Sequence, residues 1–218
     1  MEIFIDSADP KEIEKAVDTG IIDGVTTNPT LIAKHGKNLM TTISDICKII
    51  DGPVSVEVAS TEYHGMLEEG AKILDIAENI VLKLPITWNG LKACRYFYEK
   101  EREVNMTLCF SVNQALLAAK AGATYVSPFI GRLDDIGQDG NRLIAEIKEV
   151  FANYPEYDVN VLASSIRHSQ HFYMSALEGA DAATIPYNVL NQLLDHPLTD
   201  KGLDRFIKDW EKSGLIIG

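Results

Sequence analysis

Two kinds of segment alternate regularly along the chain, and this alternation constrains the fold more than any other feature. Short runs rich in β-branched residues are separated by amphipathic stretches with helical spacing. The pattern predicts strands near residues 2–6, 22–27, 53–58, 79–85, 105–110, 123–127, 159–164 and 181–185. Alternating strands and helices are typical of parallel sheets whose strands are joined by right-handed crossovers.

Eight such units in 218 residues predict one α/β domain over residues 1–218, folded as a compact (βα)8 TIM barrel with a C-terminal helical extension. An open doubly wound sheet is the main alternative. No GxGxxG motif follows the first predicted strand, which disfavours a dinucleotide-binding form of that sheet.

Helix starts are marked at two places. Asp9, Pro10 and Glu12 predict an N-cap, a first-turn proline and a capping-box partner. Ser111 with Gln114 predicts the start of a second helix in the same way.

Charge and composition exclude several classes of function. The formal net charge of -12 argues against nucleic-acid binding, which depends on Lys and Arg at phosphates. A phosphorylated substrate would then need a local cluster of arginines and backbone amides. The chain has no run of about 18 apolar residues, so no membrane span is expected. Three scattered cysteines without a CxxC pair, and an N-terminus unlike a signal peptide, fit a reducing cytoplasm.

Polar residues interrupt the predicted strands in one kind of place. A parallel sheet covered by helices should have apolar strand interiors, so the exceptions are informative. Those at or near the C-terminal ends of strands are Asp6, Thr26, Asn28, Glu57, Lys83, Thr107, Arg132, Ser165 and Arg167. In a barrel these ends converge on one mouth, where active sites of this fold are built.

Strand alternation gives a second test of this grouping, because successive side chains point to opposite faces. Residues expected to point toward the barrel axis are Phe4 and Asp6, Ser55 and Glu57, and Asn105, Thr107 and Cys109. The intervening residues, Leu108 among them, are expected to face the helices. Polar side chains from several strands therefore share the barrel interior.

Lys83 lies in the otherwise apolar run of NIVLKLPITWNG, residues 79–90. A buried lysine requires compensation, either by snorkelling to water or by pairing with a carboxylate. Alternatively, a lysine among apolar walls has a lowered pKa, and its neutral amine attacks a ketone to form a Schiff base. Asp6 and Glu57 would then transfer protons and Thr107 would hold a water. The sequence leaves both interpretations open.

Two stretches carry a resemblance to a known family. DGVTTNPTLIAK (23–34) and IVLKLPITWNGLKA (80–93) resemble the signature stretches of transaldolases, most closely the short-chain branch that also contains fructose-6-phosphate aldolase. FIDSAD, SPFIGRLDD, VLASSIR and HPLTDKGLDRFIKDWEK extend the match over nearly the whole chain. The resemblance implies a (βα)8 barrel and Schiff-base catalysis without metal or cofactor.

Matching positions then imply a role for each candidate residue. Lys83 would be the Schiff-base lysine and Asp6 the base at the substrate C4 hydroxyl. Glu57 and Thr107 would position the water used in dehydration and hydrolysis. The implied substrate-binding residues are Thr26, Asn28 and Phe129, with Arg132, Ser165 (or its neighbour Ser164) and Arg167 at the phosphate.

The family contains two activities, and two residues distinguish them. Transaldolases pass a dihydroxyacetone unit from a ketose phosphate to an aldose phosphate, whereas the aldolase releases dihydroxyacetone. Like transaldolases, this chain has Glu57 and Phe129, where the aldolase branch has Gln and Tyr. Because Phe129 has no hydroxyl to relay a proton to the enamine, we expect transfer to prevail over hydrolysis. Fructose-6-phosphate aldolase is the alternative.

Two other classes remain open on the sequence. A sugar-phosphate binder without enzymatic activity would need the arginines but no reactive amine. A metal enzyme is suggested by His168 and His171, three residues apart on a predicted helix, although no carboxylate or cysteine completes the set. The isolated histidines His35, His64 and His196 are expected at the surface.

The C-terminal segment carries an apolar stripe at helical spacing, formed by Leu203, Phe206, Ile207 and Trp210. It predicts a helix at about residues 202–212. The stripe would pack either against the chain's own barrel or against a neighbouring subunit. Relatives on this branch use the C-terminal helix to grip a neighbour, so the resemblance implies a homo-oligomer, with a decamer as the expected state.

Overall fold

Eight parallel strands close into a barrel in chain order, and β8 pairs back with β1. The computed structural model describes residues 1–34 and 38–216, so His35 lies outside the described residues. The strands are β1 Glu2–Asp6, β2 Gly24–Thr26, β3 Val54–Glu57, β4 Ile80–Pro85, β5 Val104–Cys109, β6 Tyr125–Pro128, β7 Asn160–Ala163 and β8 Ala182–Ile185. The predicted (βα)8 barrel is confirmed, and the open sheet is wrong.

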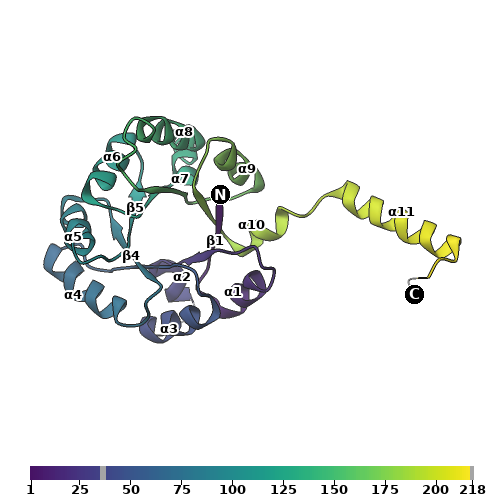
Figure 1. Cartoon of the computed structure of the whole chain (residues 1–218), viewed down its shortest axis with the longest axis horizontal. Helices are drawn as coiled ribbons and strands as arrows, with labels where there is room; N and C mark the ends of the chain where they lie inside the picture. Colours follow the sequence, from purple (N-terminus) through teal and green to yellow (C-terminus); the bar gives the residue numbers. More distant parts are fainter. Residues whose placement is uncertain (35–37, 217–218) are drawn as a thin grey trace.

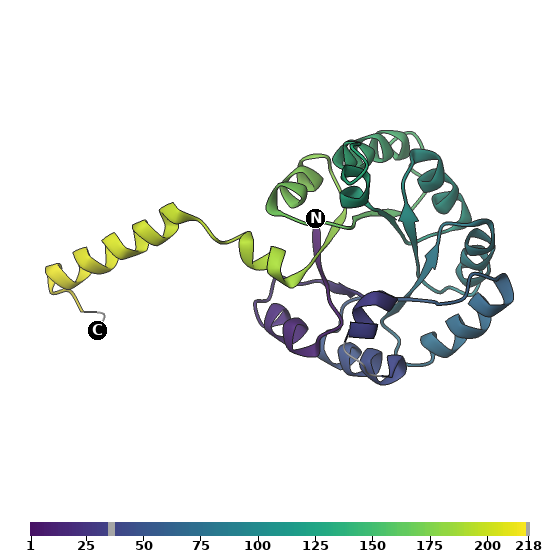
Figure 2. The ribbon, with the colours of Figure 1, turned by 180° about the vertical axis from the view of Figure 1, so that it is seen from behind.

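Helices surround the barrel as an outer ring (Figure 1), and the view from behind shows the same ring (Figure 2). They are α1 Pro10–Val17, α2 Pro29–Lys34, α3 Leu39–Ile49, α4 Tyr63–Leu74, α5 Trp88–Tyr98, α6 Val112–Ala121, α7 Ile130–Asp134, α8 Gly140–Phe151, α9 Ser169–Leu177, α10 Tyr187–Gln192 and α11 Pro197–Ser213. Outward-facing strand residues such as Ile5, Val56 and Leu82 pack beneath this ring in one continuous core.

A second, smaller core fills the N-terminal half of the barrel interior. It consists of Phe4, Val81, Tyr125, Leu162 and Ala182, one residue from each of five strands. Two residues further along each strand stands a polar side chain, namely Asp6, Lys83, Ser127, Ser164 and Thr184. The period of two therefore stacks a polar layer directly on an apolar plug, at the end where the strands finish.

The helix-start predictions are confirmed with one correction. Asp9 caps α1 by accepting from the Lys11 amide, and Ser111 caps α6 by accepting from the Gln114 amide. Glu12 does not complete a capping box. A capping box would require the Asp9 amide to donate to Glu12, but that amide donates to the Ser7 hydroxyl oxygen. The Ser7 hydroxyl in turn donates to the Glu12 carboxylate at 2.6 Å.

Strand β5 departs from the predicted alternation near its end. Its register against β6 shifts between Met106 and Cys109, and Leu108 has a positive φ of 60°. A bulge of this kind adds one residue and reverses the facing of those that follow. Cys109 therefore packs in the helix-facing core, and Leu108 lines the mouth of the barrel. The predicted facing of both residues is wrong.

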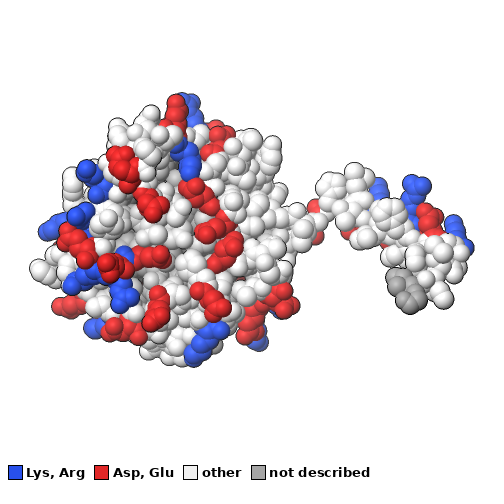
Figure 3. Space-filling model, in the orientation of Figure 1, with Lys and Arg blue, Asp and Glu red and all other residues white. Residues whose placement is uncertain are grey.

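Helix α11 projects away from the barrel beyond α10 (Figures 1 and 2). It runs from Pro197 to Ser213, longer than predicted, and none of these residues is buried. The four residues of its apolar stripe are 46% to 70% exposed. The interpretation in which the stripe packs against the chain's own barrel is therefore wrong. Figure 3 shows both basic and acidic side chains along the projecting helix and over the visible face of the barrel.

Among residues 1–34 and 38–216, no helix has the length and apolar character needed to cross a bilayer.

Candidate active site

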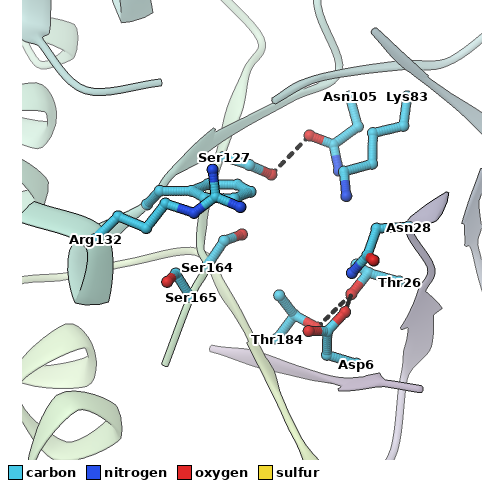
Figure 4. Close-up of a pocket in the computed structure, with 11 residues that line it drawn as sticks. Asp6, Thr26, Asn28, Lys83, Asn105, Ser127, Arg132, Ser164, Ser165 and Thr184 are labelled. Carbon is cyan, nitrogen blue, oxygen red and sulfur yellow. Dashed lines mark hydrogen bonds between the residues drawn. The ribbon is translucent and has the colours of Figure 1, made fainter. Parts of the chain in front are cut away.

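A cavity of about 140 Å³ opens at the C-terminal ends of the strands (Figure 4). Its lining residues are Asp6, Thr26, Asn28, Lys83, Asn105, Ser127, Phe129, Arg132, Ser164, Ser165 and Thr184. A wider opening of about 430 Å³ shares Asn28, Lys83, Phe129 and Arg132 with it and adds Pro29, Thr30, Leu31, Glu57 and Leu108. Most of the residues that the sequence predicted for one site are therefore brought together.

Lys83 is 5% exposed and stands on β4 in register with Glu57 on β3. Its Nζ lies 3.1 Å from Glu57 Oε2 and donates to the Thr27 carbonyl oxygen at 3.1 Å. The amine points into the cavity toward Asn28 (Figure 4). Lys83 is thus both paired with a carboxylate and presented to the cavity, which joins the two interpretations that the sequence left open.

Asp6 lies at the end of β1, with one side toward the cavity and the rest enclosed by protein. It accepts from the Thr26 hydroxyl at 2.8 Å. Burial raises the pKa of Asp6, the Lys83 charge and the Thr26 hydrogen bond lower it, and the Glu57 charge adds a smaller increase. The net upward shift makes the Asp6 carboxylate a stronger base than an exposed aspartate.

A buried network of hydrogen bonds crosses three strands on the far side of Lys83. Ser127 on β6 donates to Asn105 Oδ1 at 2.7 Å, and Asn105 donates through Nδ2 to Ser55 on β3 at 3.2 Å. These bonds fix the orientation of the Asn105 amide at the cavity wall.

Sequence reasoning missed three cavity-lining residues as site residues, Asn105, Ser127 and Thr184, and named Ser164 only as an alternative to Ser165. The signal that would have found Ser127 and Thr184, and that also marks Ser164, is alternation in short strands. In YVSP, VLAS and AATI, a polar residue follows an inward apolar residue by two positions.

Thr107 lies fully buried on β5 at the level of Pro85. Within residues 1–34 and 38–216, its Oγ1 has no hydrogen-bond partner. A buried hydroxyl without a partner is costly. In the described part of the chain, Thr107 lines neither of the two cavities at the strand ends, although it lies on the strand next to Lys83.

Arg132 from α7 approaches the cavity from the side opposite Asp6 (Figure 4). Its guanidinium carbon lies 5.0 Å from the centre of the Phe129 ring, a cation–π geometry that orients the charged group. The Phe129 ring makes an edge contact with Phe110, at 5.9 Å between centroids. Phe110 therefore packs against Phe129, and Phe129 packs against the Arg132 guanidinium.

The loop after β7 closes tightly on α7. Ser165 has a positive φ of 60°, and a Cβ on Gly131 would lie 2.2 Å from the Ser165 carbonyl oxygen. Only glycine at position 131 permits this approach. The Ser164 hydroxyl donates to the Leu162 carbonyl at 3.0 Å, which favours Ser165 over Ser164 as the donor to a ligand.

Arg167 is not among the cavity-lining residues found in the described part of the chain. Its two Nη atoms contact the two carboxylate oxygens of Asp135, Nη2 at 2.6 Å from Oδ2. This hydrogen-bonded pair lowers the pKa of Asp135 and raises that of Arg167. A phosphate at Arg167 would have to compete with this carboxylate.

The two histidines considered as metal ligands have other partners. The distance between His171 Nε2 and Asp134 Oδ2 is 2.6 Å, and His171 Nδ1 accepts from the Arg167 amide. His168 is the N-cap of α9 and accepts from the His171 amide, so only His171 lies within the helix. Among the residues that the structure describes, no group of three or more His, Cys, Asp or Glu is arranged to hold a metal ion.

The two sequence comparisons with known proteins match the same family. The family model described as Transaldolase/Fructose-6-phosphate aldolase matches residues 3–215. Probable transaldolases from Parvibaculum lavamentivorans and Brucella anthropi are each 55% identical over 217 residues, and one from Chelativorans sp. is 52% identical over 218 residues. Each comparison covers 100% of both chains.

A solved structure of thiamine phosphate pyrophosphorylase from Pyrococcus furiosus resembles the chain with a TM-score of 0.59 at 13% identity. The match covers 88% of this chain and 93% of that one. At this identity the likeness bears on the barrel fold alone.

Proposed function

The chain belongs to the transaldolase/fructose-6-phosphate aldolase family, and on that premise we propose that it is a transaldolase of the pentose phosphate pathway. It transfers a dihydroxyacetone unit from sedoheptulose 7-phosphate or fructose 6-phosphate to glyceraldehyde 3-phosphate or erythrose 4-phosphate. The observation that carries the proposal is the buried Lys83, which is paired with Glu57 at 3.1 Å and lines the same cavity as a second carboxylate, Asp6.

The first step is attack of the Lys83 amine on the ketone of the donor sugar. The ammonium must first lose a proton, and the Glu57 carboxylate at 3.1 Å is within reach to accept it. Glu57 then returns protons through a water to the hydroxyl that leaves as the carbinolamine dehydrates. Within the part of the chain that the structure describes, the buried Thr107 hydroxyl on the neighbouring strand has no hydrogen-bond partner, which supports a place for that water beside it.

The second step breaks the bond between C3 and C4 of the donor. Asp6 takes the proton of the C4 hydroxyl, the C4 oxygen becomes an aldehyde, and the bonding electrons move into the iminium at Lys83. The aldose phosphate leaves and a three-carbon enamine stays bound. Asn28, Asn105 and Ser127 line the cavity beside Lys83 and supply hydrogen bonds for the hydroxyls of that fragment.

Phosphate recognition follows from the charge distribution. A net charge of -12 repels a sugar phosphate from most of the surface, so binding depends on the local cation Arg132 and the Ser165 hydroxyl. Arg167 joins them when a phosphate displaces Asp135, because a dianionic phosphate is a stronger partner than one carboxylate.

Transfer, rather than release of free dihydroxyacetone, is supported by Phe129 at the cavity wall. An aldolase has to protonate the enamine, and a phenyl ring offers no proton. The test is release of glyceraldehyde 3-phosphate from fructose 6-phosphate, with and without erythrose 4-phosphate. A transaldolase requires the acceptor. Equal release without it identifies an aldolase, and no release in either case identifies a binder without this activity.

We also propose that the chain is a single domain acting in the cytoplasm as a homo-oligomer, a decamer. The exposed apolar stripe of α11 supports assembly, because an apolar face of this length is costly in water. In the assembly α11 lies against a neighbouring subunit.

A further inference from the structure

Three side chains from three strands form a hydrogen-bonded chain beneath the catalytic carboxylate. Thr184 Oγ1 on β8 lies 2.6 Å from Thr26 Oγ1 on β2, and the Thr26 hydroxyl donates to Asp6 Oδ1 on β1 at 2.8 Å. Strand β1 separates the other two, since Phe4 is in register with Thr184 and Asp6 with Thr26. Figure 4 shows the two dashed contacts converging on Thr26.

The number of hydroxyl protons available fixes the direction of this series of hydrogen bonds. Each threonine hydroxyl has one proton to donate. With Asp6 ionised, the Thr26 proton is used at Asp6, so the short contact between the threonines is a hydrogen bond only if Thr184 donates. The order is then Thr184 to Thr26 to Asp6. Donation from Thr184 polarises the Thr26 hydroxyl and strengthens its bond to the carboxylate.

The hydrogen bond from Thr26 to Asp6 lies in buried surroundings, which increases its effect on the Asp6 carboxylate. Thr26 is 1% exposed and Thr184 is 4% exposed, so water competes poorly for either hydroxyl. The charged groups that face Asp6 are Lys83 from β4 and Glu57 from β3, and their effects on Asp6 oppose each other. Since burial disfavours the ionised form, the hydrogen bond from Thr26 is one of two contributions that keep Asp6 available as a base.

We propose that Thr184 is a positioning residue for the proposed reaction, acting through Thr26 to hold the Asp6 carboxylate ionised and oriented toward the substrate. When Asp6 accepts a proton, the chain reverses, and Asp6 donates to Thr26 and Thr26 to Thr184. Both protonation states of Asp6 then have hydrogen-bond partners without movement of the strands. This inference rests on the proposed role of Asp6 as the base.

The test compares Thr184→Val, which keeps the shape but removes the donor, with Thr184→Ser, which keeps the donor. The carboxyl ¹³C shift of Asp6 is titrated in the full chain, assigned with Asp6→Asn. We expect Thr184→Val to raise the Asp6 pKa by about half a unit or more, and Thr184→Ser to leave it as in the unmodified chain. Thr42→Val removes another buried hydroxyl, in α3, and serves as the matched control.

Kinetics supply the second readout. In Thr184→Val we expect kcat for transfer to fall. The acidic limb of the pH profile of kcat/KM should move to higher pH by the same amount as the Asp6 pKa. KM for fructose 6-phosphate should stay within twofold. An unchanged Asp6 titration in Thr184→Val, or an equal shift in Thr184→Ser, overturns the inference. A rise in KM alone also overturns it, because that result assigns Thr184 to substrate contact.

Two provisions keep the test decisive. If Thr184→Val does not fold, Thr184→Ala removes the same hydroxyl without the second methyl group. Because the titration of Asp6 requires no turnover, it tests Thr184 even if the chain proves to have no transfer activity, in which case the proposed function fails by itself.

Discussion

The Nζ atom of Lys83 lies 3.1 Å from Oε2 of Glu57, on neighbouring strands whose registers place the two residues side by side. A second bond to the Thr27 carbonyl holds the amine at this position. The amine is therefore directed at the cavity before any substrate arrives, and its proton has an acceptor within reach. Both features are required of a lysine that attacks a ketone at neutral pH.

Replacing Glu57 by glutamine should slow transfer. Glutamine keeps the size and a hydrogen-bond acceptor but does not take or return a proton. We expect kcat/KM for transfer to fall by about 100-fold or more, as is typical when a general acid–base group is removed. Glu68→Gln, an exposed change on α4, is the control. Transfer at the unmodified rate in Glu57→Gln would refute the proposed role of this residue.

The choice between transfer and release should respond to a hydroxyl at position 129. We expect Phe129→Tyr to increase release of dihydroxyacetone in the absence of acceptor by roughly tenfold or more, since the phenol is able to protonate the enamine. Phe110→Tyr adds the same hydroxyl to the ring in edge contact with Phe129, outside the cavity lining. The ratio of cleavage to transfer is the measurement, and an unchanged ratio in Phe129→Tyr counts against the account.

The raised pKa of Asp6 predicts a pH-dependent effect on stability. Its folded pKa lies above the reference value of 3.8, so ionisation costs the folded state more than the unfolded chain. The stability associated with protonated Asp6 is present below about pH 3.8 and lost as the pH rises through the folded pKa. Asp6→Asn should therefore raise the melting temperature by roughly a few degrees at pH 7, and the gain should vanish toward pH 3.8.

The matched control for that experiment is a carboxyl group whose pKa is shifted in the opposite direction, Asp135. Arg167 lowers the pKa of Asp135, so Asp135→Asn should leave the protein equally or slightly less stable at pH 7. Melting curves of both variants between pH 4 and pH 8 decide the matter. A lower melting temperature for Asp6→Asn at pH 7 would mean that the carboxylate stabilises the fold, contrary to its direction of shift.

Most of the fold and part of the site follow from sequence alone, for a physical reason. Strand period and parity are local properties, so the eight strands and the inward facing of Asp6 and Glu57 could be read from residues two positions apart. The bulge at Leu108 could not, because nothing in MTLCF marks an added residue. Arg167 pairs with Asp135, 32 positions away, and such a contact exists only once the loops are folded.

Helix α11 should govern the oligomeric state. We expect the protein to have a solution mass of ten chains of 24.1 kDa. Phe206→Asp places a charge in the apolar stripe and should produce smaller species, whereas Lys208→Asp, on the same helix outside the stripe, should not. Light scattering at assay concentration gives the masses. A monomer for the unmodified chain would contradict the assembly.

The most direct test of the central claim is reductive trapping of the enzyme with fructose 6-phosphate and borohydride, followed by intact mass and peptide mapping. The account predicts a single covalent adduct on Lys83 that depends on the sugar and is absent in Lys83→Met. Surface lysines such as Lys92 should stay unmodified. Absence of any adduct, or an adduct that persists in Lys83→Met, would contradict Schiff-base chemistry at this site.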